Sequence, residues 1–302
     1  MILCGTELRP DGGRGYDAIV GLAVDAGFEG LALGGWCTRQ EAIKLVAAAA
    51  ASGLAVPVAS APLLAAPLAP GKRLPFLASL DDPEERRAAA ELVATTIAAA
   101  SPLGVSTFTL SFGDVGLGVA PERLARWFRR REMDEDEPGG EALAAVLAER
   151  RARSPGITDA CRAGLDLVIP AAERVGAILA IELSGGPWGI PSPREVAALL
   201  DEYREAPIGV VWDQARMSVL ARLGAAPSLE RAERLRGGTR LWRANEAVGI
   251  EVGFLPGQGE APGDAAAIPA SDRPAPVVIT GRRDSTLDEV RRALALTRPK
   301  PA

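Results

Sequence analysis

Carboxylate side chains stand at the ends of short apolar runs in the second half of the chain. Glu182 and Asp213 each end such a run, and Glu246 stands just after a third. Carboxylates that meet in a cleft can transfer protons or hold a divalent cation. These three residues are the candidate catalytic residues, as groups that could transfer a proton.

Two arginines occupy comparable places. Arg216 follows Asp213 by three residues, and Arg243 precedes Glu246 by three. A guanidinium group stays protonated and forms paired hydrogen bonds with carboxylates, so neither arginine can serve as a base. Two interpretations stay open: the arginines bind an anionic group of a ligand, or they neutralise Glu182 and Asp213 in place of a metal ion.

The chain contains no histidine. This excludes Ser-His and Cys-His nucleophiles and every imidazole-bound metal. Two carboxylates with water can bind Mg²⁺ weakly, whereas a tight Mn²⁺ or Zn²⁺ site needs nitrogen ligands. We therefore expect either a weakly bound divalent metal, Mg²⁺ or Mn²⁺, or none.

Composition limits the class of protein. The 302 residues are 48% hydrophobic with a net charge of -5, which is typical of a globular protein and disfavours nucleic-acid binding. No apolar run is long enough to span a membrane, and the first residues do not resemble a signal peptide, so a cytoplasmic protein is expected. Cys4, Cys37 and Cys161 have no metal or redox spacing.

Apolar strands alternate with amphipathic helices along the whole chain, which predicts a parallel sheet. The predicted strands are 2–8, 30–33, 54–59, 105–110, 177–183, 208–212, 239–243 and 277–280. The predicted helices are 16–26, 38–51, 82–100, 159–175, one opening at 192, 227–235 and 285–296. This number of units favours a single (β/α)8 barrel over residues 1–302. A Rossmann fold is the alternative, but no strand is followed by G-x-G-x-x-G.

Two segments interrupt this pattern. The segment 121–154, after the fourth strand, is highly charged. It is interpreted either as solvated helices or as a lid that brings arginines over an anionic ligand. The segment 256–276 is rich in Gly, Pro and Ala, and it replaces a clear seventh helix with an irregular connection between strands seven and eight.

The residues at the predicted strand ends resemble the motifs of the xylose-isomerase-like superfamily. Glu182 resembles its metal-binding glutamate, and Asp213 with Arg216 resembles its Asp-x-x-His motif with arginine for histidine. The resemblance therefore implies Glu182 and Asp213 as the candidate metal ligands. Similarly, Arg243 to Glu246 resembles a His-x-x-acid motif, and 257–260 resembles a Gly-x-Gly-acid loop. Further matches with a changed residue are Ser60 and Ser111 for histidines, Thr280 for a final glutamate, and Ala32 for an acid.

The resemblance implies a protein like the sugar (phosphate) isomerases and epimerases, acting on a small polyol, sugar or keto acid, with its metal site at least partly lost. It implies substrate contacts from Arg216, Arg243, Trp188, Ser60 and Ser111. Two alternatives stay open. One is a non-catalytic barrel that binds a ligand or partner, and the other is a metal-independent lyase-type enzyme that binds an anionic substrate through Arg216 and Arg243. The DNA-repair branch is disfavoured by the missing histidines, and a homo-oligomer is compatible with the resemblance.

Overall fold

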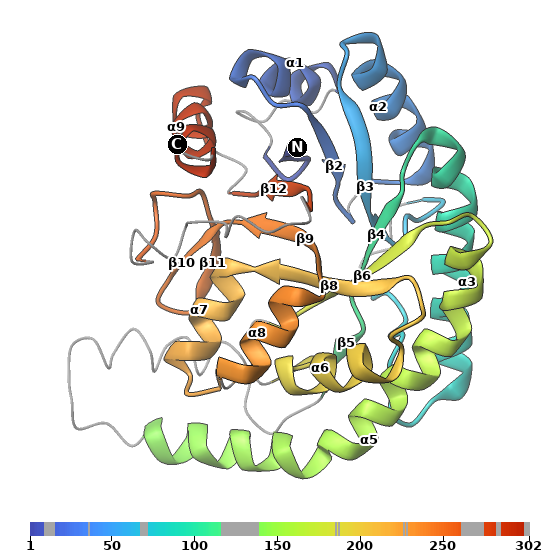
Figure 1. Cartoon of the computed structure of the whole chain (residues 1–302), viewed down its shortest axis with the longest axis vertical. Coiled ribbons are helices and arrows are strands. Elements are labelled where there is room, and N and C mark those ends of the chain that lie inside the picture. The colour runs from blue at the N-terminus through green and yellow to red at the C-terminus, as the bar shows by residue number, and fades with distance from the viewer. Residues whose placement is uncertain are drawn as a thin grey trace.

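Eight parallel strands form a closed barrel in the computed structural model of the chain (Figure 1). The structure describes residues 1–8, 16–35, 37–66, 72–115, 139–184, 188–225, 229–260, 275–281 and 285–298, with Gly186 and Pro227. The barrel strands are β1 (Ile2–Gly5), β2 (Gly30–Leu33), β3 (Ala55–Ala61), β4 (Thr107–Leu110), β6 (Ile178–Glu182), β8 (Ile208–Asp213), β9 (Thr239–Ala244) and β12 (Val277–Ile279). The predicted barrel and its predicted strands are confirmed.

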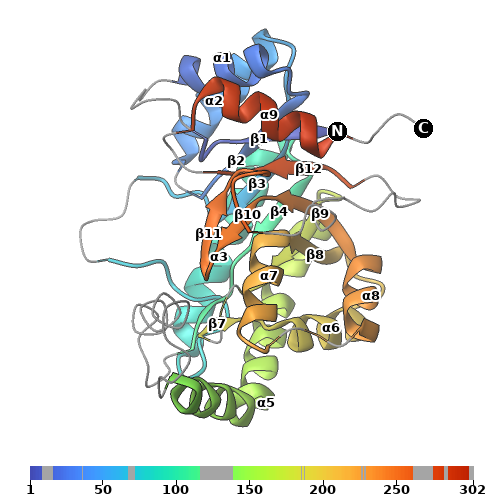
Figure 2. The same ribbon diagram turned by 90° about the vertical axis from the view of Figure 1, so that its left-hand side faces the viewer.

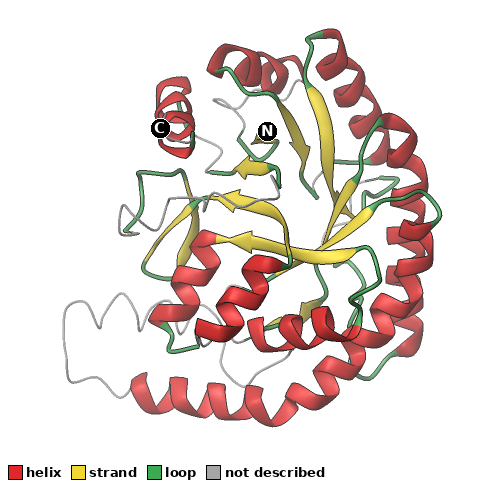
Figure 3. Cartoon of the chain, viewed as in Figure 1, coloured by secondary structure: helices red, strands yellow, loops and turns green. Residues whose placement is uncertain are grey.

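Helices surround the barrel, with the strands inside (Figure 3). The helices are α1 (Tyr16–Ala26), α2 (Arg39–Ala51), α3 (Pro83–Ala100), the 3-10 turn η1 (Ser101–Leu103), α5 (Gly139–Glu173), α6 (Pro193–Glu202), α7 (Gln214–Arg222), α8 (Leu229–Gly237) and α9 (Leu287–Thr297). Helices α1, α2 and α9 lie toward one end of the molecule and α5 to α8 toward the other (Figure 2). No helix in these described ranges is both long and apolar enough to cross a membrane.

Side-chain caps set the starts of several helices. Thr38, Ser192 and Thr286 each accept from the backbone N–H three residues later, and a glutamate there binds back to the cap. Asp82 caps α3 and Pro83 opens it, as the sequence predicts. Because such caps satisfy N–H groups that have no partner within the helix, they place each helix start with little ambiguity.

Alternate residues of each strand face opposite sides of the barrel wall. The inner layer is a small cluster of buried side chains: Leu3, Ala32, Val58, Ala180, Val211, Leu241 and Val278. Residues next to these in sequence, such as Val210 and Trp212, pack instead into the larger cluster that includes residues of the outer helices. The two-residue period of a strand produces this division, and it also decides which side chains reach the barrel mouth.

Two short antiparallel sheets were not predicted. The first pairs β5 (Gly113–Asp114) with β7 (Gly189–Ile190), and the second pairs β10 (Glu246–Val248) with β11 (Glu251–Phe254). Both follow the carboxyl ends of barrel strands, so they extend the walls of the mouth. The hairpin of β10 and β11 stands where the sequence lacked a helix after strand seven, while residues 261–274 of the irregular connection lie outside the described residues.

The charged segment 121–154 is described only from residue 139 onward, where it forms the first half of α5. Arg150 in this half is buried, and its guanidinium forms two 2.7 Å hydrogen bonds with the Glu195 carboxylate. The interpretation of this half as a solvated face is therefore wrong at Arg150, which joins α5 to α6. Residues 121–138, and with them the proposed lid, lie outside the described residues.

Candidate active site

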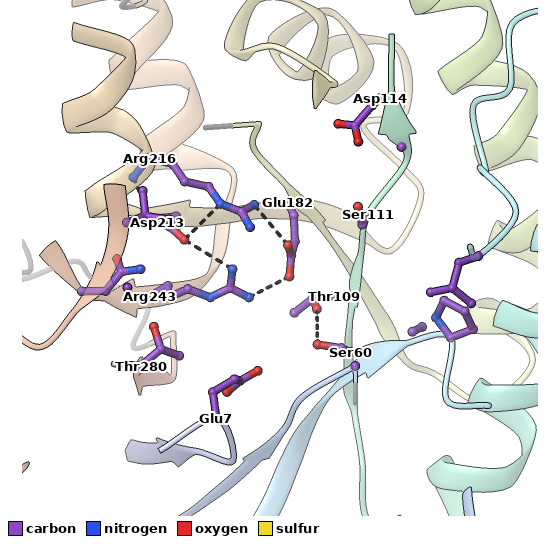
Figure 4. Close-up of a pocket in the computed structure, with 18 of the residues that line it drawn as sticks. Glu7, Ser60, Thr109, Ser111, Asp114, Glu182, Asp213, Arg216, Arg243 and Thr280 are labelled. Carbon is purple, nitrogen blue, oxygen red and sulfur yellow. Dashed lines mark hydrogen bonds and ion pairs between the residues drawn. The ribbon is translucent and has the colours of Figure 1, made fainter. Parts of the chain in front are cut away.

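Side chains two residues beyond the inner layer converge on one cavity at the barrel mouth. Ser60 follows Val58, Glu182 follows Ala180, Asp213 follows Val211, Arg243 follows Leu241, and Thr280 follows Val278. The strand period carries each of them to the same inner side as its predecessor. They line a cavity of about 500 Å³, which we call the barrel-mouth cavity. Figure 4 shows its labelled side chains.

Two guanidinium groups bridge two carboxylates at one wall of this cavity (Figure 4). Arg243 places Nη2 2.7 Å from Oε1 of Glu182 and Nη1 3.3 Å from Oδ2 of Asp213. Arg216 places Nη1 3.1 Å from Oε2 of Glu182 and Nε 3.5 Å from Oδ2 of Asp213. The four residues form a closed ring of opposite charges, which we call the arginine–carboxylate cluster.

The spacing of Asp213 and Arg216 follows from a helix start. Asp213 ends β8 and caps α7, and its Oδ1 accepts from the Arg216 backbone N–H at 3.0 Å. The cap puts Arg216 in the first turn, where its side chain folds back over Asp213 and also donates to the Leu183 carbonyl at 2.6 Å. Arg243 pairs beside Asp213 in the register of β8 and β9. The backbone therefore holds both arginines against Asp213.

The cluster keeps Glu182 and Arg243 ionised. Burial alone would raise the pKa of the Glu182 carboxyl, but the charges of Arg243 and Arg216, with hydrogen bonds from Arg243 and Thr109, hold that pKa well below its ordinary value. Burial alone would lower the pKa of the Arg243 guanidinium, but the charges of Glu182 and Asp213 raise it. Opposite charges at hydrogen-bond distance outweigh desolvation in both cases.

The side chains of the arginine–carboxylate cluster do not fit a tightly held divalent metal ion. Oxygens of Glu182 and Asp213, the residues that the sequence proposed as metal ligands, already accept from the two arginines. Within the described ranges, no group of three or more His, Cys, Asp or Glu side chains is arranged to hold a cation. A cation at this place would meet two guanidinium groups, so metal binding would first require both arginines to move away.

The other predicted site residues fall into two groups. Ser60 and Ser111 line the barrel-mouth cavity, and Trp188 lines an adjoining cavity of about 270 Å³ that shares Glu182 and Arg216 with it. Glu246 does not line the barrel-mouth cavity. It is buried in β10, and its Oε2 accepts from the Gly259 N–H at 2.5 Å.

Glu246 and the Gly-x-Gly-acid segment together stabilise the hairpin of β10 and β11. Glu260 forms a 2.8 Å ion pair with Arg222 of α7 and accepts from the Gly249 N–H.

Trp212 and Trp242 also lie away from the cavity. Their rings pack together, with centroids 5.6 Å apart, in the cluster outside the strands.

Two acidic residues of the cavity were missed at the level of sequence. Glu7 lies in the turn after β1, and Asp114 lies in β5; both line the barrel-mouth cavity. Burial raises the pKa of the Asp114 carboxyl. Glu7 could have been recognised as a site residue, because it is the first charged residue after the apolar run of β1. It was instead included in the predicted strand 2–8. Asp114 stands in a glycine-rich loop that gave no such signal.

The chain resembles known proteins in its fold and not in its sequence. No model of a protein family matches the chain, and no curated protein sequence does. Among solved structures, 3-keto-D-glucoside 4-epimerase from E. coli has a TM-score of 0.67 at 15% identity, over 98% of both chains. The chain has the fold of the xylose-isomerase-like barrels.

Other solved structures share this fold. D-psicose 3-epimerase from Clostridium cellulolyticum H10, in a structure with D-tagatose, has a TM-score of 0.63 at 12% identity, over 97% of this chain and 96% of that one. A xylose isomerase domain protein from Planctomyces limnophilus has a TM-score of 0.58 at 15% identity, over 98% and 93%. The resemblance seen in the sequence is thus confirmed for the fold, and activity has to be argued from the cavity.

Proposed function

We propose that the protein is a metal-independent isomerase or epimerase that acts on an uncharged sugar or polyol-derived ketone in the barrel-mouth cavity. The observation that carries this proposal is the double bridge from Arg216 and Arg243 to Glu182 and Asp213. It supplies positive charge where a metal would otherwise neutralise the two acids. A guanidinium can stabilise developing negative charge on a substrate oxygen, as a metal ion does.

Charge in the cavity favours a neutral ligand. Glu7, Asp114, Glu182 and Asp213 line it, against the two arginines of the cluster, so its formal charge is negative. Both arginines are already paired with carboxylates. An anionic substrate would therefore meet repulsion here, and we set aside the alternative in which Arg216 and Arg243 bind one. The similar structures include sugar epimerases with D-tagatose, in complex with D-allulose and in the presence of D-fructose, and this agrees with a neutral sugar.

Arg216 is the member of the cluster best placed to touch the ligand. Its side chain is 27% exposed, against 2% for Asp213. Its Nη1 and Nε face Glu182, Leu183 and Asp213, and within the described ranges no residue accepts from Nη2. Arg216 would therefore donate from Nη2 to the carbonyl oxygen of the substrate and polarise it.

The proton transfer needs a carboxylate outside the cluster. Glu182 is a weak base because its pKa is held far below neutrality, and Asp213 is buried beneath both arginines. Glu246 does not line the cavity. Asp114 lines it with a raised pKa, closer to the pH at which an acid–base catalyst works best. We therefore reassign the base to Asp114, which would take the proton from the carbon beside the carbonyl and leave an enediolate. Return of this proton to the former carbonyl carbon, with the hydroxyl proton passing to the former carbonyl oxygen, completes an isomerisation, whereas inversion of the same carbon requires a second acid on the opposite face of the enediolate.

Solvent exchange tests this function directly. The protein is incubated in ²H₂O with EDTA and a panel of neutral ketoses that includes D-tagatose, D-fructose and D-allulose, and deuterium on carbon is followed by NMR. The proposal expects enzyme-dependent incorporation that persists in EDTA. Incorporation that appears only when Mn²⁺ is added would contradict it.

A non-catalytic sugar-binding barrel is the second candidate. The observation that favours it is the pairing of all four charges of the cluster, which leaves Glu182 no capacity to exchange protons near neutrality. Sugar binding detected by titration calorimetry, with no deuterium incorporation for any bound sugar, would select this candidate.

A further inference from the structure

A second cavity, outside the barrel mouth, is lined by arginine. It has a volume of about 270 Å³ and lies among α5, α6 and the segment between α7 and α8. Its charged lining residues are Arg150, Arg151, Arg194 and Arg231, and none of its described lining residues is acidic. We call it the arginine cavity. Its charge is opposite to that of the barrel-mouth cavity.

One of these arginines is a fixed part of the wall. Arg150 forms two 2.7 Å hydrogen bonds with Glu195, whose carboxylate also accepts from the Ser154 hydroxyl and the Ser192 N–H. The Arg150 side chain is 8% exposed, and its Nε–H is buried with no acceptor among the residues that the structure describes. Glu195 therefore compensates Arg150, and no described residue of the lining offers a carboxylate to Arg151 or Arg194.

Two other arginines have side chains available to a ligand. Arg151 and Arg194 are exposed, and in the described part of the chain no side chain or carbonyl accepts from either guanidinium. Arg194 stands at the second position of α6, directly after Pro193. A cation in the first turn of a helix opposes the helix dipole, and Glu195, the acid of this turn, is already paired with Arg150.

We propose that the arginine cavity binds a phosphate group, either inorganic phosphate or a small phosphate monoester. Planar guanidinium groups match the oxygens of phosphate with paired hydrogen bonds. Ser184 and Gly186 line both this cavity and the adjoining cavity that holds Trp188. The phosphate group would therefore lie across one wall from the proposed sugar site, as a ligand separate from the neutral substrate.

Titration calorimetry of the full chain at fixed ionic strength tests this, with inorganic phosphate and glycerol 3-phosphate as probes. The test variant is Arg151→Gln with Arg194→Gln. The matched control is Arg174→Gln with Arg292→Gln, which removes the same charge from exposed positions outside the cavity. We expect the test variant to weaken binding at least about tenfold, as the loss of charge-assisted hydrogen bonds predicts, and the control to leave it unchanged.

The two probes identify the source of the phosphate group. Equal affinity for both points to inorganic phosphate, and tighter binding of glycerol 3-phosphate points to a monoester. Absence of saturable binding to the unmodified protein, or equal weakening in both double variants, would overturn the proposal. Binding of a neutral sugar by the test variant is measured in parallel, so that a failure of this site is distinguished from a failure of the barrel-mouth site.

Discussion

The guanidinium of Arg243 lies 2.7 Å from the carboxylate of Glu182, across the inside of the barrel between β9 and β6. Its other terminal nitrogen reaches Asp213 on β8, which lies between these two strands. One side chain therefore ties three strands together at the mouth. This contact links the stability of the barrel to the charge of its cavity.

Removing the Arg243 guanidinium should destabilise the fold strongly. Arg243→Met leaves Glu182 and Asp213 facing each other with only Arg216 between them, both mostly buried. Breaking a buried ion pair typically costs about 3–5 kcal/mol, and we expect a loss of that order in urea unfolding. Arg162→Met is the control, because Arg162 also pairs with two acids but is 38% exposed, and its loss should be much smaller. Similar losses for both variants would contradict the importance of the buried cluster.

Stability should fall at acid pH through Glu182. Its pKa in the folded protein lies below the ordinary glutamate value of about 4.3. Ionised Glu182 therefore stabilises the fold fully at a pH above its pKa in the unfolded chain. This stabilisation is lost as the pH falls from that value toward the lower pKa of the folded protein. We expect Glu182→Gln to flatten the dependence of the unfolding free energy on pH below about pH 4.3. The exposed Glu173→Gln should leave the dependence as it is, and an unchanged slope in Glu182→Gln would refute the assignment.

Asp114 should control the proton transfer rather than the binding of the sugar. Asp114→Asn should lower deuterium incorporation by about 10²–10⁴-fold, the usual contribution of a general base, with sugar affinity little changed. Because burial raises the pKa of Asp114, the rate should rise with pH through a value above that of an ordinary aspartate. The exposed Asp81→Asn is the matched control. Undiminished exchange in Asp114→Asn would move the base elsewhere, with Glu7 as the next residue to test.

Gly113 should not tolerate a side chain. Its φ is +119°, and a Cβ there would lie 2.4 Å from the Phe76 ring. Gly113→Ala should therefore destabilise the protein by about 1–3 kcal/mol through overpacking and strain in β5. Gly156→Ala is the contrast, because it lies inside α5 with nothing within 4 Å of the new Cβ apart from its chain neighbours and the backbone of its own helix, and alanine favours helix by roughly 0.5–1 kcal/mol. Thermal unfolding of the two variants should shift in opposite directions.

The barrel could be predicted because each strand carries its own signal. The apolar run 208–212 lies between Pro207 and Asp213, and the two-residue period identifies Glu182, Asp213 and Arg243 as inward-facing ends. Helix α7 was not predicted, because its cap is Asp213, which had been interpreted as a possible metal ligand. The predicted helix 159–175 begins 20 residues too late, since Pro155 lies within α5 instead of ending it.

The site could be predicted only in part. Strand ends indicate which side chains share the mouth, but the pairing of both arginines with both acids depends on the register of β8 with β9 and on the α7 cap. Glu246 was assigned to the site because it follows β9 closely. The chain turns there into the hairpin of β10 and β11, which carries its carboxylate to Gly259 instead.

The most direct test of the account is the metal content of protein purified without chelator, followed by a thermal-shift titration with Mn²⁺ and Mg²⁺. A double variant, Arg216→His with Arg243→His, is measured beside it, since imidazole would restore the nitrogen ligands that a transition metal favours. The account predicts no stoichiometric metal and no stabilisation of the unmodified protein at millimolar concentration, and Mn²⁺ binding by the double variant. Stoichiometric metal in the unmodified protein, lost in Glu182→Gln, would contradict the replacement of the ion by Arg216 and Arg243.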